Sequence, residues 1–306
     1  MCYLTQPLLH VEELPADVGV DPALLRQHVE VLARDLVPRD AEHPENLERA
    51  AAYVRARFAA QVGHAELQPF VVDGRTHHNV IARLGPADGE RIVVGAHYDA
   101  AAPGIGADDN ASGVAGLIEL AGLLARAELA TCVELVAFAL EEPPYFRTRS
   151  MGSFTHAEAL RREGVRVRAM LSLEMIGCFR DEPGSQSYPA PGLTFLYPPR
   201  GDFIAVVGCL GQAGLVRSVK RAMRAATELP VRSINAPRWL PGVDFSDQLH
   251  YWDAGFDAVM ITDTAFYRNP RYHTAADTPE TLDYRRMAAV VEGVCAAVRA
   301  LDGRAG

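Results

Sequence analysis

The feature that most constrains the fold is CVELVAFAL, residues 132–140, a run of strand length that is apolar except for Glu134. A strand that is apolar on both faces is typical of a sheet covered by helices on both sides. Other strand-like runs alternate with segments of helical periodicity, such as SGVAGLIELAGLLARA at 112–127. This alternation predicts a mostly parallel sheet. We therefore predict a three-layer α/β/α fold around a central, mostly parallel, mixed sheet.

The predicted elements extend from residue 22 to residue 301, and Asp21 is the predicted N-cap of the first helix. Helices are predicted at 22–36, 45–62, 112–127, 153–164, 212–227 and 281–301, and strands at 67–72, 77–84, 91–97, 132–140, 167–173, 201–208 and 258–263. No repeat or linker interrupts them. We predict one catalytic domain, 1–306, with helices of residues 1–65 packed on it. The Pro- and Gly-rich loops 177–200 and 235–245 are expected to shape a cleft.

Composition excludes several classes of protein. The formal net charge of −9 argues against a nucleic-acid surface and against a polybasic membrane patch. No window approaches about 18 uninterrupted apolar residues, so no membrane span is predicted. Five widely spaced cysteines without a CxxC pair indicate reduced thiols. The first 19 residues lack the pattern of a secretion signal, and we expect a cytoplasmic protein.

Acidic and imidazole side chains follow four of the predicted strands. They are His97 and Asp99, Glu141 and Glu142, Glu174, and, after a short loop, Tyr272 and His273. Ligands of such sheets bind beyond the carboxyl ends of the strands. The adjacent carboxylates of Asp108 and Asp109 lie in a loop that begins at the same edge. The side chains are therefore predicted to meet there, around cations.

Zinc is the cation that this mixture of imidazole and carboxylate ligands suits, with Mn²⁺ or Co²⁺ as substitutes. Two histidines and three carboxylates exceed the needs of one tetrahedral ion. They fit two ions that share a bridging carboxylate. Asp99 lies two residues after His97, so in an extended segment both point to one side. It is placed to accept the second ring N–H of His97.

Five motifs match those of one known protein family, in the same order, from about residue 75 to the C-terminus. They are HYD at 97–99, GADDNASG at 106–113, EE at 141–142, LEMIG at 173–177 and YHTAADTPETL at 272–282. Together they resemble the M28 family of zinc metallopeptidases, which includes bacterial leucyl-type aminopeptidases and the related glutaminyl cyclases.

The resemblance implies a role for each matching residue. His97 and Glu174 would bind one zinc ion, with Glu174 standing where many members have aspartate. Glu142 and His273 would bind the other ion. Asp108 would bridge the two, with a cis peptide between Asp108 and Asp109. Glu141 would be the general base, and Tyr272 matches a tyrosine that stabilises the oxyanion in some relatives.

The leading prediction is a di-zinc exopeptidase, an aminopeptidase or dipeptidase, in which a metal-bridging water attacks a peptide or aminoacyl substrate. Two alternatives stay open: a glutaminyl-cyclase-like acyltransferase with one zinc, and a non-catalytic peptide-binding homologue. Aromatic residues of the long loops favour an apolar side-chain preference: Phe179, Tyr188, Phe195, Trp239, Phe245 and Trp252. The physiological substrate and the oligomeric state stay open.

Other sites are not supported by the sequence. Ser112 lacks the GxSxG elbow of a serine nucleophile. GIGADDNASG is neither GxGxxG nor GxxxxGK[ST], and its aspartates would repel phosphate. His77 and His78 are expected to be structural, and Cys178 is not expected to bind zinc.

Overall fold

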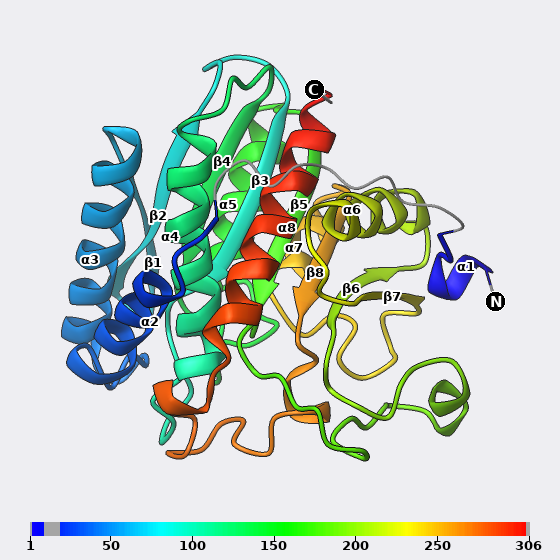
Figure 1. The fold of residues 1–306 in the computed structure, drawn as a ribbon. Helices are drawn as coiled ribbons and strands as arrows, with labels where there is room; N and C mark the ends of the chain where they lie inside the picture. The colour runs from blue at the N-terminus through cyan, green and yellow to red at the C-terminus, as the bar shows by residue number, and fades with distance from the viewer. Residues whose placement is uncertain (1, 9–18, 304–306) are drawn as a thin grey trace.

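Figure 1 shows the computed structural model of the chain, which describes residues 2–8 and 19–303. Across these residues an eight-stranded sheet has the order β1-β2-β4-β3-β5-β8-β6-β7. The strands are β1 (Glu66–Val72), β2 (Arg75–Leu84), β3 (Arg91–His97), β4 (Cys132–Phe138), β5 (Val167–Glu174), β6 (Ile204–Cys209), β7 (Val231–Ala236) and β8 (Ala258–Thr262). The helices are α1 (Cys2–Thr5), α2 (Pro22–Glu30), α3 (Pro44–Val62), α4 (Gly113–Leu124), α5 (Gly152–Arg162), α6 (Ala213–Ala226), α7 (Gln248–Asp253) and α8 (Tyr284–Asp302).

Four neighbouring strands in the middle of the sheet, β4, β3, β5 and β8, are parallel to one another. Antiparallel pairing of β2 with β4 and of β6 with β8 makes the sheet mixed. Helices α3, α4, α8 and α6 pack along one face, and α5 and α7 cover the other (Figure 1). The predicted three-layer fold with a mostly parallel, mixed sheet is confirmed.

The central strands are buried because their side chains are apolar on both faces. Every residue of β4 is buried, as the run 132–140 predicted. The larger core lies between the sheet and the α4/α8 layer, and a second core around Phe138, Met170 and Tyr251 lies under α5 and α7. At the start of α2, Asp21 accepts a hydrogen bond from the backbone N–H of Ala23 (2.8 Å), as predicted.

Three of these elements were missing from the predictions, the four-residue helix α1 among them. Strand β7 was missed because VRSINA mixes polar and apolar residues, as an edge strand does. The short helix α7 was missed because six residues are too few to show a helical period. Much of the N-terminal sequence behind the predicted cytoplasmic location lies outside the described residues. No helix in the described part of the chain has both the length and the apolarity needed to cross a membrane.

Close contact between β3 and β4 gives a prediction for stability. A Cβ on Gly95 of β3 would overlap the ring of Phe138, which is fully buried in β4. Gly95→Ala is therefore expected to lower the free energy of unfolding by about 1–3 kcal/mol. Denaturant unfolding of the wild type and the variant measures this difference in free energy.

The matched control is Gly214→Ala in the first turn of α6, where no heavy atom lies within 4 Å of the new Cβ. There alanine should leave stability unchanged or raise it by up to about 1 kcal/mol, because it favours the helix. Equal destabilisation by the two substitutions would contradict the packing argument.

Candidate metal centre

The carboxyl ends of the four parallel strands place the candidate residues at one edge of the sheet. His97 is the last residue of β3 and Glu174 the last of β5. Glu141 and Glu142 follow β4, and His273 lies in the loop after β8. Because parallel strands end at the same edge, residues up to 176 positions apart in the sequence become neighbours.

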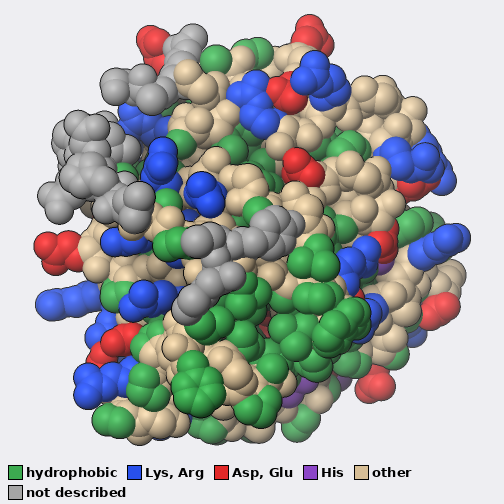
Figure 2. Space-filling view, turned by 90° about the vertical axis from the view of Figure 1, so that its right-hand side faces the viewer, with side chains coloured by type: hydrophobic (Ala, Val, Ile, Leu, Met, Phe, Trp, Pro, Cys, Tyr) green, Lys and Arg blue, Asp and Glu red, His purple; other side chains and the backbone are tan. Residues whose placement is uncertain are grey.

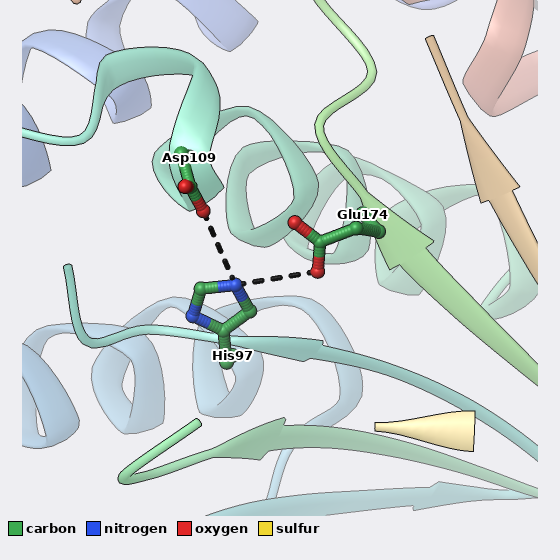
Figure 3. A group of neighbouring side chains, drawn as sticks. All are labelled: His97, Asp109 and Glu174. Atoms are coloured by element: carbon green, nitrogen blue, oxygen red, sulfur yellow. Dashed lines mark ion pairs between the residues drawn. The ribbon is translucent and has the colours of Figure 1, made fainter. Parts of the chain in front are cut away.

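The first group of side chains forms around His97 (Figure 3). Its Nε2 atom lies 3.4 Å from Oδ1 of Asp109 and 3.3 Å from Oε2 of Glu174. Glu141 Oε2 stands 3.8 Å from the same nitrogen. All of these side chains are buried. A buried imidazole nitrogen that faces several carboxylate oxygens is the donor set of a transition-metal site.

The second group forms around His273, which is partly exposed. Its Nε2 atom lies 3.1 Å from Oδ2 of Asp109 and 3.2 Å from Oε2 of Glu142. Asp109 is thus common to both groups and turns one oxygen toward each. This is the arrangement of a carboxylate that bridges two ions.

Asp108 does not face either group, contrary to its predicted bridging position. Its Oδ1 accepts a hydrogen bond from the N–H of Gly177 (3.0 Å), and its Oδ2 accepts one from Asn269 Nδ2 (2.9 Å). The prediction was displaced by one residue, and so was the cis peptide, which joins Asp109 to Asn110. The reason is that adjacent side chains of a non-helical segment diverge, so only one of the two aspartates can enter the cluster.

A further acidic group lies behind the first two, where Asp108 approaches Asp263 and Cys178. Here a cation is already supplied by the buried guanidinium of Arg268, which acts against the rise in the pKa of Asp263 that burial causes. Burial also raises the pKa of the Cys178 thiol, so a thiolate is disfavoured there. We assign this group a structural role.

The residues of the two candidate groups fit bound cations. Among the described residues, neither ring nitrogen of His97 nor Nε2 of His273 has a hydrogen-bond partner, although carboxylate oxygens stand 3.1–3.5 Å away. Burial acts to lower the pKa of His97, but Glu174 and Glu141 outweigh it and raise that pKa well above its usual value. Burial raises the pKa of Glu142 to about 7, with Asp109 adding to the effect. Divalent ions would relieve this crowding of acidic groups.

Hydrogen bonds around the cluster hold its members in place. Asp99 Oδ1 lies 3.5 Å from His97 Nδ1, on the side predicted from its spacing, and its Oδ2 accepts from the N–H of Glu142 (3.0 Å). Ser246 Oγ donates to Glu174 Oε2 (2.6 Å). A carboxylate beside the second ring nitrogen, and carboxylates held by hydrogen bonds, are typical of the surroundings of metal ligands.

Three supporting residues were not predicted from the sequence. Asp277 accepts hydrogen bonds from the N–H groups of Asp108 and Asp109 and so fixes the loop. The buried guanidinium of Arg39 donates to four backbone carbonyls, those of Leu32, Tyr98, Ile105 and Gly106. Asn110 donates to the carbonyl of Leu173 at the end of β5. Asp277 lies within the YHTAADTPETL motif and Asn110 within GADDNASG, whereas no motif pointed to Arg39.

Backbone strain occurs at three positions in or beside the candidate metal centre. Leu140 precedes Glu141, Met175 follows Glu174, and His273 is itself in the candidate set. All three adopt positive φ angles, of 62°, 51° and 57°. Residues other than glycine rarely adopt this conformation, which costs about 1–3 kcal/mol and is concentrated at functional sites.

Tyr272 connects the cluster to an apolar pocket. Its ring stacks on the imidazole of His273 with centroids 3.7 Å apart. Tyr272 and Glu174 both line an open pocket with about 830 Å³ of empty space, part of it continuous with solvent. Tyr188 and Phe245, two of the aromatic residues expected to define a side-chain pocket, also line it. Phe179 and Trp252 instead pack against the hydrophobic cores.

Comparison with protein families decides the class of protein. The sequence model of Peptidase family M28 matches residues 79–298. The chain belongs to peptidase family M28. The predicted family and the predicted class of enzyme are thereby confirmed. This M28 peptidase is also 47% identical over 281 residues to the uncharacterized protein YfbL of Escherichia coli (strain K12), covering 89% of this chain and 86% of that protein.

Solved structures share the fold of this M28 peptidase at low sequence identity. LapB from Legionella pneumophila matches with a TM-score of 0.73 and 22% identity, covering 92% of this chain and 72% of LapB. A zinc aminopeptidase from Bacillus subtilis matches with a TM-score of 0.71 and 15% identity, over 94% and 95% of the two chains. A glutaminyl cyclase from Bacteroides thetaiotaomicron matches with a TM-score of 0.66 and 18% identity, over 94% and 99%.

The different orientations of the two adjacent aspartates predict different effects on metal content. Asp109→Asn is expected to reduce the zinc content of the protein by at least half, because one side chain serves both groups. Asp108→Asn should retain zinc, because the pKa of Asp108 is already raised well above its usual value by burial and by Asp263. Elemental analysis of the purified variants measures both. Loss of zinc from Asp108→Asn alone would reverse the assignment.

Metal removal should lower thermal stability. Binding to the folded state alone stabilises it by about 2.7 kcal/mol when the free ion is at 100 times its Kd. Melting curves of chelator-treated protein should therefore shift upward when zinc is added. Mg²⁺ at the same concentration is the control, since imidazole ligands suit it poorly. Equal shifts with both ions would argue against a site built on His97 and His273.

Proposed function

We propose that this M28 peptidase is a di-zinc exopeptidase that removes residues from the amino end of peptides. The observation that carries the proposal is Asp109, whose two carboxylate oxygens face two separate histidine–carboxylate groups. In the proposed site, His97 and Glu174 would hold one ion, Glu142 and His273 would hold the other, and Asp109 would be shared by both groups. Bound zinc would supply Lewis acidity and lower the pKa of a water near neutrality.

Glu141 is the proposed general base. It is buried beside the cluster, and its carboxylate is oriented differently from that of Glu142, which approaches His273. It would accept the proton of the attacking water and return it to the leaving amine, so that the carboxylate is regenerated. Asp99 would orient His97, and Tyr272 would donate its phenolic hydrogen to the oxyanion.

The pocket supports an exopeptidase with an apolar preference. The pocket begins at Glu174 and Tyr272. If the side chain of the substrate's amino-terminal residue lay in the pocket, the peptide bond after that residue would lie beside the cluster. The walls of the pocket are largely apolar, with Leu193, Val243 and Met260 among them. Large side chains such as leucine or phenylalanine would bury most of their surface there.

Replacement of the proposed base tests the mechanism. Glu141→Gln removes the proton acceptor but keeps the size of the side chain, so kcat is expected to fall by roughly 10²–10⁴-fold. Zinc content should not change. Hydrolysis of leucyl-4-nitroanilide and elemental analysis measure the two effects, and Glu163→Gln on the exposed end of α5 is the control. Full activity in Glu141→Gln would refute the base assignment.

Substrate comparison separates the proposal from the cyclase alternative. An exopeptidase should release 4-nitroaniline from the leucyl compound and leave glutaminyl peptides uncyclised. Ammonia release from glutaminyl peptides without anilide cleavage would instead identify a cyclase. Binding of peptides without either reaction would favour the non-catalytic homologue.

A further inference from the structure

The apolar pocket continues well beyond the candidate metal centre, toward the edge of the sheet at β6 and β7. Its outer walls come from the loops before β6, after β7 and after β8. Phe266 lines the pocket and is exposed, and Phe195 and Trp239 are exposed side chains of the other two loops. Figure 2 looks onto this side of the molecule and shows hydrophobic side chains gathered in one area of it. The pocket is therefore longer than one apolar side chain requires.

A row of paired residues forms the floor of the pocket and gives its length. Glu174 of β5 pairs with Thr262 of β8, Thr262 pairs with Ala205 of β6, and Ala205 pairs with Arg232 of β7. All four line the pocket. Neighbouring strands lie about 4.8 Å apart, so the Cα atoms of Glu174 and Arg232 are about 14 Å apart. The small side chains of Thr262 and Ala205 leave the space between the charged ends open.

Arg232 projects from β7 on the pocket side. Its neighbour Ser233 points to the opposite face, where its Oγ contacts the carbonyl of Thr5 at 2.9 Å. Side chains alternate along a strand, so Arg232 and Ile234 share the face that lines the pocket. Among the described residues of the lining, only Glu174 and Arg232 carry a charge, and no salt bridge of Arg232 occurs in the described part of the chain.

The walls near Arg232 offer ring faces and few free polar groups. Tyr188 and Tyr197 stack with centroids 5.7 Å apart. Their hydroxyls donate to the backbone carbonyls of Pro198 and Ser233, at 2.5 and 2.7 Å. Among the described residues that line this end of the pocket, the guanidinium of Arg232 is thus the one cationic group that an elongated ligand would meet.

We propose that the pocket selects substrates whose amino-terminal residue has an apolar body and a terminal anion, which pairs with Arg232. The apolar body would lie over Thr262 and Ala205, and the anion would accept two parallel N–H bonds from the guanidinium. This inference rests on the proposed exopeptidase function and adds a substrate class to it. The simpler alternative is that Arg232 is a solvated charge that protects an edge strand.

The test uses 4-nitroanilides of phenylalanine, 4-carboxyphenylalanine and 4-(aminomethyl)phenylalanine, which differ only at the far end of the ring. The wild type should prefer the carboxylated compound. Arg232→Gln should raise its KM by roughly 10- to 100-fold, the loss of a charged hydrogen-bonded pair. The kcat and the phenylalanyl reaction should stay unchanged. Arg232→Glu should shift the preference to the aminomethyl compound.

Arg217→Gln on the outer face of α6 removes an exposed arginine elsewhere and is the matched control. If the phenylalanyl compound is cleaved but Arg232→Gln leaves the ratio of the substrates unchanged, this inference fails and the exopeptidase proposal stands. If no anilide is cleaved, the exopeptidase proposal fails. The inference is then decided by calorimetry, which requires no turnover. The affinities of free 4-carboxyphenylalanine and of phenylalanine are measured for the wild type and for Arg232→Gln. Equal affinities would overturn the inference.

Discussion

The gathering of acidic side chains around two imidazoles is the interaction on which the rest of this structure depends. Asp109, Glu142 and Glu174 are buried within a few ångströms of one another and of His97. Carboxylates brought together away from water repel each other and are protonated unless cations compensate them. The shifted pKa values of Glu142 and His97 show this cost. The neighbouring pair Asp108 and Asp263 shows the same cost, since burial raises the pKa of Asp263 to about 7 although the Arg268 guanidinium opposes the rise.

The fold supplies the stiffness that such a cluster needs. Four parallel strands, buried on both faces, end at one edge and fix the Cα positions of His97 and Glu174. Positive φ angles beside the candidate ligands then turn the chain so that the side chains meet. The side chains of Arg39 and Asp277 make hydrogen bonds to the backbone of the Asp109 loop and hold it in place. Rigid elements that support a flexible loop are a general requirement for precise ligand geometry.

The same sheet also connects the cluster with the pocket. Strands β8, β6 and β7 continue the row that begins at Glu174, so the floor of the pocket is an extension of the strand that supplies a candidate ligand. In the proposed function, substrate chemistry and substrate selection would therefore be built on one rigid surface. A side chain that changed the floor at Ala205 would alter selection without touching the cluster. The two properties can be studied separately because they lie on different strands.

The sequence by itself determined seven of the eight strands, the parallel centre of the sheet, the family and most of the cluster. Buried apolar strands and the polar residues that follow them are local patterns, and His97, Glu142, Glu174 and His273 meet where those patterns placed them. Only the tertiary structure decided which of two adjacent aspartates enters the cluster. That choice depends on the backbone angles of Asp109, on Asp277, which accepts its N–H from 168 residues away, and on the Gly177 N–H that holds Asp108. Arg232 was hidden for the same reason, because its relation to Glu174 exists only through three successive strand pairings.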